Sequence, residues 1–465
     1  MPTPLTHLEG NLRPLVRLVW PVLIENTLHL LVQYVDLWLT GNYLRDEAYL
    51  AAVTLMVYVM WFVFNLFALV AQGATAVIAR YVGAGNYRQA SRAANQAITI
   101  GLVWSMALVV IGLLAAEPVV HLLQLEGAAA DAAVQYLRIL VWALPAVMLE
   151  EVGFASLRGA GDTLTGLIVM SIVNLINIAV SSSLLLGLGP LPEMGWIGLA
   201  IGTATGHAVG GLIVLILLAR GRAGLRLRWV RMRPRSEMIR RILRIGIPGG
   251  IDSLMIVACH LWYVSIINQL GNMATAAHGV GVQIEALAYM PGAAFQIAAA
   301  TLAGQYLGAR DYASARRSVL LACAVGAGVM ITAGAVIYLA AVPLSAFFLG
   351  GPDSEVVPIT ARLLRVVAFS MPALAVGMIL QGALRGAGDT RWPLLFTLVG
   401  MLGLRIPLAY WLAHDSVTLL GGMFEFDGWG LGVLGAWYAM FVDVVVRCLL
   451  VVTRFRHGGW QRIEV

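Results

Sequence analysis

The stretch that decides the fold is Leu157-Arg158-Gly159-Ala160-Gly161-Asp162-Thr163, because it occurs twice. The second copy, Leu384-Arg385-Gly386-Ala387-Gly388-Asp389-Thr390, is identical letter for letter and lies 227 residues further along the chain. The same offset maps Pro21 onto Pro248, and each proline lies near the start of a long apolar segment. Seven consecutive identities at one offset predict that the chain is a tandem duplication.

Two shorter matches support the duplication elsewhere in the chain. At an offset of 225, residues 81–84 (Tyr-Val-Gly-Ala) correspond to residues 306–309 (Tyr-Leu-Gly-Ala). At an offset of 233, the Gly-Trp pair at 195–196 corresponds to the pair at 428–429. We therefore predict three regions, a first lobe, a linker and a second lobe, over residues 1–219, 220–244 and 245–465.

The composition is that of an integral membrane protein. Hydrophobic residues make up 60% of the chain, charged residues only 12%, and the mean hydropathy is +0.85. A soluble globule of this length would have too little polar surface to cover itself. The three cysteines, Cys259, Cys323 and Cys448, lie singly in apolar segments, so we expect small core residues and neither a metal site nor disulfides. We predict no cofactor.

Windows of about 20 apolar residues predict twelve membrane-spanning helices, six in each lobe. The first apolar run is too long and too polar for a cleaved signal, so it counts as a span. No strand signal is evident, and lipid excludes open sheet edges, so we expect an all-α integral membrane bundle. The windows cover residues 16–41, 50–79, 93–116, 132–156, 164–187, 195–219, 239–270, 274–305, 319–342, 357–384, 393–412 and 430–452.

Charges in the connections predict the orientation. Arginines gather in the even-numbered connections and acids in most odd-numbered ones, which places the even connections and both termini in the cytoplasm. Six spans is an even number, so the lobes enter the membrane from the same side and are parallel repeats about a pseudo-two-fold axis along the membrane normal. The linker from Arg220 to Arg244 holds ten arginines against Glu237 alone. It is either a positive-inside anchor or an anionic-lipid site.

One face of the first predicted helix is polar. Glu25, His29, Gln33 and Asp36 follow at helical spacing and share that face. A carboxylate near the bilayer centre costs about 2.5–3.5 kcal/mol on insertion scales, which favours a water-lined cavity over lipid contact. Hydrogen bonding between helices is the competing interpretation.

The second lobe repeats the polar face with different side chains. In its first two helices we expect cavity-facing side chains at Asp252, His260, Tyr263, Gln283, Glu285 and Tyr289. The histidines share no metal-ligand spacing, so we interpret them as core or cavity residues. Asp443 and Arg447, four residues apart in the last helix, are predicted to neutralise each other. Arg405 needs an acidic partner that the sequence does not identify.

The repeated stretch itself fits a tight turn between two helices. Each copy ends an apolar helix, turns on two glycines and opens the next helix with Asp-Thr, which is a C-cap followed by an N-cap. We expect it to fix a cytoplasmic hinge rather than to bind substrate. The predicted hinge residues are Arg158, Gly159, Gly161, Asp162, Arg385, Gly386, Gly388 and Asp389.

With these features the whole chain resembles the multidrug and toxic compound extrusion (MATE) transporters. That family shows two six-helix lobes and a Leu-Arg-Gly-x-Gly-Asp-Thr turn after the fourth and tenth helices. Pro21 followed by Asp36, residues 284–292 (Ile-Glu-Ala-Leu-Ala-Tyr-Met-Pro-Gly) and residues 304–309 (Gly-Gln-Tyr-Leu-Gly-Ala) add to the likeness. The resemblance implies a V-shaped pair of lobes that export organic cations by antiport with protons or sodium.

The resemblance also implies an ion site. Asp36 resembles the family's coupling carboxylate, Asn177 its partner in the fifth helix, and Thr203 a further ligand. Many prokaryotic members carry an aspartate where this chain has Ser181, and one carboxylate in place of two binds sodium less strongly. We therefore favour protons over sodium as the coupling ion, with Glu25 as a further carboxylate.

The resemblance and the composition together set the expected partners and two competing functions. We expect cationic amphipathic small molecules as cargo, a monomer in the bilayer of a prokaryotic plasma (inner) membrane, and no nucleic acid. A lipid-linked precursor flippase of the same architecture is the main alternative, but it needs a large basic cavity. An intramembrane enzyme using His29 or His260 is disfavoured, because no nucleophile motif accompanies either histidine.

Overall fold

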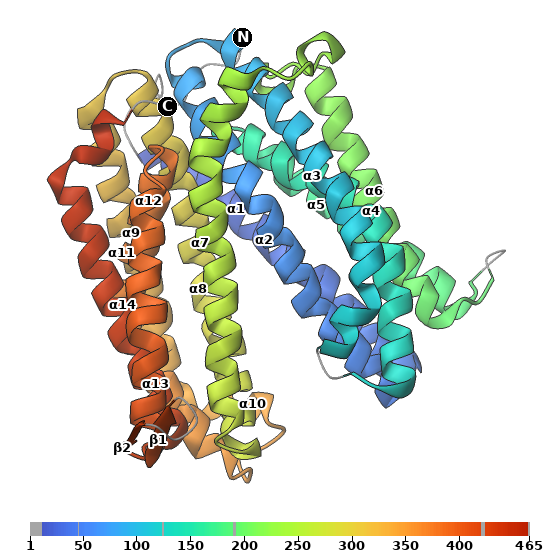
Figure 1. The fold of residues 1–465 in the computed structure, drawn as a ribbon, viewed down its shortest axis with the longest axis vertical. Helices are drawn as coiled ribbons and strands as arrows, with labels where there is room; N and C mark the ends of the chain where they lie inside the picture. The colour runs from blue at the N-terminus through green and yellow to red at the C-terminus, as the bar shows by residue number, and fades with distance from the viewer. Residues whose placement is uncertain (1–11, 45, 123–124, 189–191, 420–423, 464–465) are drawn as a thin grey trace.

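The computed structural model describes residues 12–44, 46–122, 125–188, 192–419 and 424–463 (Figure 1). Within these residues, twelve helical spans are long and apolar enough to cross a membrane, as predicted. The first six are α1 with the π-helix η2 (Leu12–Leu39 and Thr40–Leu44), α2 (Glu47–Gly83), α3 (Tyr87–Leu122), α4 (Gly127–Gly159), α5 (Leu164–Leu186) and α6 (Gly195–Ala219). The others are α7 (Ser236–Asn268), α8 (Asn272–Gly308), α9 (Tyr312–Leu339), α11 (Val356–Gly386), α12 to α13 (Arg391–Ala413) and α14 (Gly432–His457).

The remaining elements are short. The linker holds two 3₁₀ turns, η3 (Arg222–Gly224) and η4 (Trp229–Arg231), and a third, η7 (Gly459–Arg462), follows α14. Helix α10 (Ala341–Phe348) connects α9 to α11. The span from α12 (Arg391–Thr397) to α13 (Ile406–Ala413) is interrupted by a π-helix, η5 (Leu398–Arg405).

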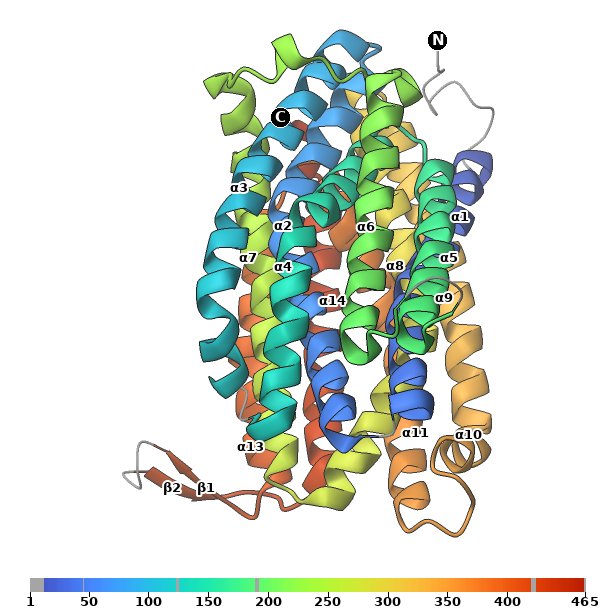
Figure 2. The ribbon, with the colours of Figure 1, turned by 90° about the vertical axis from the view of Figure 1, so that its right-hand side faces the viewer.

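The all-α membrane bundle is confirmed, and one connection adds a pair of short strands that the sequence analysis did not predict. Strands β1 (Ser416–Leu419) and β2 (Phe424–Asp427) pair antiparallel between the last two spans, with Ser416 opposite Asp427. Both read as alternating polar and apolar residues, which is the period of a strand. The hairpin projects beyond the helical bundle (Figure 2), where lipid does not forbid its open edges.

The helices form two bundles that converge at one end and separate toward the other (Figure 1). Helices α1 to α6 make the first bundle, and α7 to α14 make the second. We call the converging end the linker end, because η3 and η4 lie there, and the opposite end the hairpin end, because β1 and β2 lie there. The contact between bundles is made chiefly by α2 packed on α7 and α8, and by α1 packed on α8.

Paired glycines bring α2 and α8 into backbone contact at the linker end. A Cβ added to Gly83 would lie 1.9 Å from the carbonyl oxygen of Gln305, and one added to Gly308 would lie 2.1 Å from that of Arg80. Arg80 and Gln305 correspond under the 225 offset, as do the two glycines. The contact is therefore reciprocal, and the duplication has produced a self-complementary interface.

The first halves of α1 and α7 pack into the core of the opposite bundle. Leu15 and Leu18 of α1 belong to a buried cluster with Leu302 of α8. Ile242 of α7 belongs to a cluster with Phe67 of α2. The later part of α1 returns to its own bundle, where α5 packs along it. This path carries the polar face of α1 into the interior of the first bundle.

Candidate functional site

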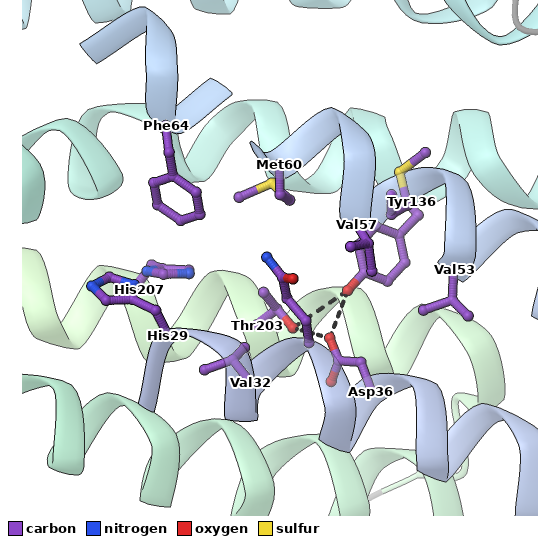
Figure 3. A pocket seen from close by; sticks show the side chains of 12 residues that line it. His29, Val32, Asp36, Val53, Val57, Met60, Phe64, Tyr136, Thr203 and His207 are labelled. Atoms are coloured by element: carbon purple, nitrogen blue, oxygen red, sulfur yellow. Dashed lines mark hydrogen bonds between the residues drawn. The ribbon is translucent and has the colours of Figure 1, made fainter. Parts of the chain in front are cut away.

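Asp36 lies at the centre of a buried hydrogen-bond network in the first bundle (Figure 3). Thr203 of α6 donates its hydroxyl to Asp36 Oδ2 at 2.7 Å, and the Tyr136 hydroxyl of α4 donates to the same oxygen at 2.9 Å. Asn177 of α5 donates its side-chain amide to Thr203 Oγ1 at 3.0 Å. Only 4% of Asp36 is exposed. Four helices therefore converge on a single carboxylate.

Two oxygens of this network are left without a donor. Asp36 Oδ1 and Asn177 Oδ1 are both buried, and neither has a hydrogen-bond partner among the described residues. A buried polar atom without a partner costs about 1–3 kcal/mol. A proton on the carboxylate, or a small cation bound to these oxygens, would remove that cost. The network can therefore hold one positive charge.

Ser181 reaches the network through Asn177. The Asn177 amide lies 3.4 Å from Ser181 Oγ, one turn further along α5. Ser181 is fully buried and packs against Gly202 of α6. The structure thus gathers Asp36, Asn177, Ser181 and Thr203 into one cluster. Their role in ion coupling stays a prediction.

A small cavity adjoins Asp36. Its volume is about 30 Å³, and a single water needs roughly 10–15 Å³. Helix α2 supplies an apolar wall to this cavity, which includes Met60 and Phe64 (Figure 3). The polar residues that line it are His29, Gln33, Asp36, Tyr136, Thr203 and His207. The structure thus places His29 and Gln33 beside the predicted ion site.

The chain matches the MatE family model over residues 21–182 and 248–411, one segment in each bundle. It belongs to the MatE family. The resemblance to MATE transporters is confirmed, and membership makes the chain a multi-pass membrane transporter rather than an enzyme. The match leaves out α6 and α14, the last span of each bundle.

Curated relatives align over nearly the whole length of this MatE chain. A probable multidrug resistance protein NorM from Thermotoga maritima is 28% identical, over 97% of this chain and 94% of that protein. Another from Bradyrhizobium diazoefficiens is 27% identical, over 97% of this chain and 95% of its own.

Solved structures share the fold. A MOP superfamily transporter from Pyrococcus furiosus superposes with a TM-score of 0.87 at 21% identity, covering 99% of both chains. An outward-facing multidrug resistance MATE transporter gives 0.86 at 21% identity, over 97% of this chain and 96% of that one. The twelve-span architecture of this MatE protein is therefore that of solved MATE transporters.

Glu25 is separated from the Asp36 network in this MatE chain. Asp36 follows Glu25 by eleven positions, which corresponds to about 16 Å along α1. Glu25 is fully buried and forms an ion pair with Arg158 of the first repeated stretch. The second bundle repeats the pair, because Asp252 accepts from Arg385 at 2.5 Å. The first acid on each polar face therefore contacts the arginine of its own repeated stretch.

The aspartates of the two repeated stretches also form ion pairs with arginines. Asp162 caps α5 by accepting from the Thr165 backbone amide at 3.1 Å, and it pairs with Arg222 of the linker at 2.6 Å. Asp389 pairs with Arg454 at 2.8 Å. Burial raises the pKa of the Asp389 carboxyl, while Arg454 opposes that rise.

The repeated stretches also join the bundles at the linker end. Thr301 of α8 donates to the Arg158 carbonyl at 3.1 Å, and Gln305 donates to the Gly159 carbonyl at 2.9 Å. From the other bundle, Arg80 of α2 donates to the Ala387 carbonyl at 3.2 Å. These contacts fit the predicted hinge position of both stretches.

The candidate residues of the second bundle do not line the cavity at Asp36 in the part of the chain that the structure describes. His260 lies edge-on to Trp61 of α2, with ring centroids 5.9 Å apart. Tyr263 is buried beside Arg405, and its hydroxyl has no partner among the described residues. Gln283 is exposed, as is 40% of Tyr289. Glu285 lies on the same helix, one turn before Tyr289.

The partner of Arg405 is Asp443. Arg405 lies 2.7 Å from Asp443 Oδ2, and Arg447 lies 2.7 Å from Oδ1, so a single carboxylate holds two guanidinium groups. Asp443 is fully buried. The predicted pairing of Asp443 with Arg447 is confirmed, and Arg405 joins it. Sequence spacing could not reveal Arg405, because it lies 38 residues before Asp443.

Sequence reasoning missed two contacts of the first bundle. Tyr136 donates to Asp36 from 100 residues away, and His207 pairs with Glu150 at 2.7 Å. The only available signal was that polar side chains are rare inside apolar helices. Glu150 and His207 each carry that signal, but nothing in the sequence pairs them.

Proposed function

We propose that this protein exports organic cations in exchange for protons by alternating access. The names of the relatives from Thermotoga maritima and Bradyrhizobium diazoefficiens point to multidrug export. The observation that carries the proposal is the buried Asp36 carboxylate, whose Oδ1 has no partner among the described residues and which borders a cavity. Such a group changes charge when a proton arrives.

Competition between a proton and an organic cation for one negative charge is enough to couple the movement of one to that of the other. An ionised Asp36 attracts a cationic guest, and its protonation removes that attraction and favours release. The two bundles alternate between linker-end-open and hairpin-end-open states, and each state exposes the site to one side. The positive-inside rule assigns the linker end to the cytoplasm, so in this proposal the end at which the bundles separate in Figure 1 faces outward. We propose the plasma membrane of a prokaryote as its location.

Protons are favoured over sodium by the composition of the cluster. Asn177, Ser181 and Thr203 are neutral, so Asp36 is its only carboxylate. Sodium would gain one charge and several neutral oxygens there, whereas a proton needs the carboxylate alone. A flippase for lipid-linked precursors is less well supported, because the polar lining near Asp36 contains no arginine.

The test is transport by the purified protein in proteoliposomes. A pH gradient and a sodium gradient are imposed separately, and efflux of a cationic dye is followed for the wild type and Asp36→Asn. We expect dye movement with the pH gradient and its loss in Asp36→Asn. Glu117→Gln is the matched control, because Glu117 is an exposed acid of the same bundle that pairs with Arg138.

Each outcome separates the alternatives. If only the sodium gradient drives dye movement, sodium is the coupling ion in place of the proton. Dye movement that survives in Asp36→Asn would show that this carboxylate does not couple. If neither gradient moves dye, and cells lacking the protein accumulate a lipid-linked precursor, the flippase interpretation would replace the exporter.

A further inference from the structure

A buried histidine and glutamate lie next to the Asp36 network without belonging to it. His207 Nδ1 of α6 lies 2.7 Å from Glu150 Oε2 of α4, and only 4% and 1% of their side chains are exposed. Glu150 Oε1 is buried without a partner among the described residues. Ionisable groups this deep in a membrane helix are expensive and usually serve transport.

The pair is connected to Asp36 through the cavity. His207 and Thr203 lie one turn apart on α6, and both line the cavity that also contacts Asp36 (Figure 3). The cavity is large enough for a water molecule. A hydrogen-bonded path can therefore run from Asp36 through water to the His207 ring and on to Glu150.

The pair lies between Asp36 and the linker end. Helix α6 runs toward the linker end, so His207 is about 6 Å nearer to that end than Thr203. Glu150 precedes Arg158, at the linker end of α4, by eight residues or about 12 Å. The polar groups thus occupy successive depths of the first bundle.

The helices packed around the pair contribute few other charged or titratable groups. Helix α1 contributes His29 to the same cavity, and α2 contributes Phe64, which packs against the His207 ring. Helix α4 adds Glu151, and the Glu25–Arg158 ion pair lies further toward the linker end. On α5 and α6, the neighbours of Glu150 are uncharged, namely Val173 and Gly210.

We propose that His207 and Glu150 form a proton relay that carries the coupling proton between Asp36 and the linker end. This inference rests on the proposed proton coupling and deepens it. In the starting state, neutral His207 donates its Nδ1 proton to ionised Glu150. A proton leaving the Asp36 carboxyl group crosses the cavity water to His207 Nε2, while the Nδ1 proton moves to Glu150. Asp36 becomes ionised, Glu150 becomes neutral, and His207 has exchanged one ring proton for another.

The second bundle has no such pair at the corresponding positions. The 227 offset, which relates α4 to α11, maps Glu150 onto Gly377, and the 233 offset, which relates α6 to α14, maps His207 onto Met440. Asp36 likewise maps onto Tyr263 at the 227 offset. The proposed relay therefore belongs to one bundle only, the one that contains Asp36.

Two transport assays on the same proteoliposomes test the relay. The first measures dye movement driven by a pH gradient. The second measures exchange of labelled for unlabelled dye at equal pH, which needs no net proton transfer. Glu150→Gln keeps the volume and the hydrogen bond to His207 but cannot titrate, whereas Glu150→Asp can titrate but is one methylene shorter. Ser156→Ala is the control, because Ser156 is a buried polar residue of α4 that bonds only to its own helix, at the Val152 carbonyl.

We expect Glu150→Gln and His207→Asn to slow pH-driven movement by about 100-fold, the scale of a lost proton-transfer group. In Glu150→Gln, which lies outside the cavity lining, dye exchange should stay near the wild-type rate. Glu150→Asp should recover part of the pH-driven rate, and the double variant should be no slower than either single one, because both residues serve one path.

Other results would overturn the relay. If Glu150→Gln keeps the pH-driven rate, Glu150 carries no proton. If Glu150→Gln loses both activities together while Glu150→Asp is worse, the pair is structural. If the wild type shows no pH-driven movement, the proposed proton coupling fails and the relay fails with it. If the wild type behaves as expected and only the variants depart from the expected results, the relay fails and proton coupling stands.

Discussion

A methyl group added to either glycine of the reciprocal contact between α2 and α8 should open the protein at the linker end. In Gly83→Ala the new Cβ would lie 1.9 Å from a backbone oxygen, against at least 3.4 Å for an ordinary contact, so the helices must part by about 1.5 Å. In Gly308→Ala the corresponding distance is 2.1 Å. Overpacking of this kind typically costs about 1–3 kcal/mol. The contact needs the two helices to touch at the linker end, so we expect only the state closed there to be destabilised.

The expected result is a shift toward the linker-end-open state. A bias of about 1–3 kcal/mol changes the ratio of two states by roughly 5- to 150-fold. Spin labels at Arg88 and Ala313, exposed positions related by the 225 offset, would report the distance between bundles. We expect each alanine variant to add a population at longer distance, with similar size in the two variants.

The control lies on the same helix. Gly279 of α8 has no atom within 4 Å of an added Cβ, so Gly279→Ala should leave the distance distribution unchanged. If Gly83→Ala and Gly308→Ala both retain the wild-type distribution, the glycines do not hold the linker end closed. Strongly unequal shifts would contradict the reciprocal description of the interface.

Two further predictions concern stability. Asp443→Asn leaves the guanidinium groups of Arg405 and Arg447 buried without a counter-charge, and breaking a buried pair in this way costs about 3–5 kcal/mol. Its thermal unfolding in detergent should shift strongly downward, whereas Glu117→Gln, at an exposed pair, should shift little; equal shifts would contradict the assignment. Gln96 holds the linker by donating to the Arg231 carbonyl at 2.7 Å and accepting from the Arg235 amide at 2.9 Å. Gln96→Ala should therefore speed tryptic cleavage within residues 226–235, and an unchanged digestion rate would show that these bonds do not hold the linker.

Much of the architecture was predictable from the sequence because its causes are local. A span of about 20 apolar residues must cross a membrane as a helix, so the twelve spans followed from hydropathy. The repeated stretch indicated the duplication, and the resemblance it supported indicated Asp36, Asn177 and Thr203. The strands Ser416–Leu419 and Phe424–Asp427 were missed, because two four-residue strands give little signal.

The polar face of α1 shows where prediction from one helix ends. Helical spacing placed Glu25 and Asp36 on the same face, but it could not say that Glu25 meets Arg158 while Asp36 meets Tyr136. The partners come from other helices and lie 133 and 100 residues away. Periodicity orients a side chain about its own axis, whereas its neighbour is set by the packing of all the helices together.

The sequence by itself determined that this chain is a duplicated bundle of membrane helices with a few acids inside. Only the tertiary structure decided which acids form ion pairs with arginines and which acid borders a cavity. It also decided that His207 lies against Glu150. The physical reason is the range of the forces involved. Lipid selects helices segment by segment, whereas the pairing of buried charges depends on close packing between segments that are distant in the chain.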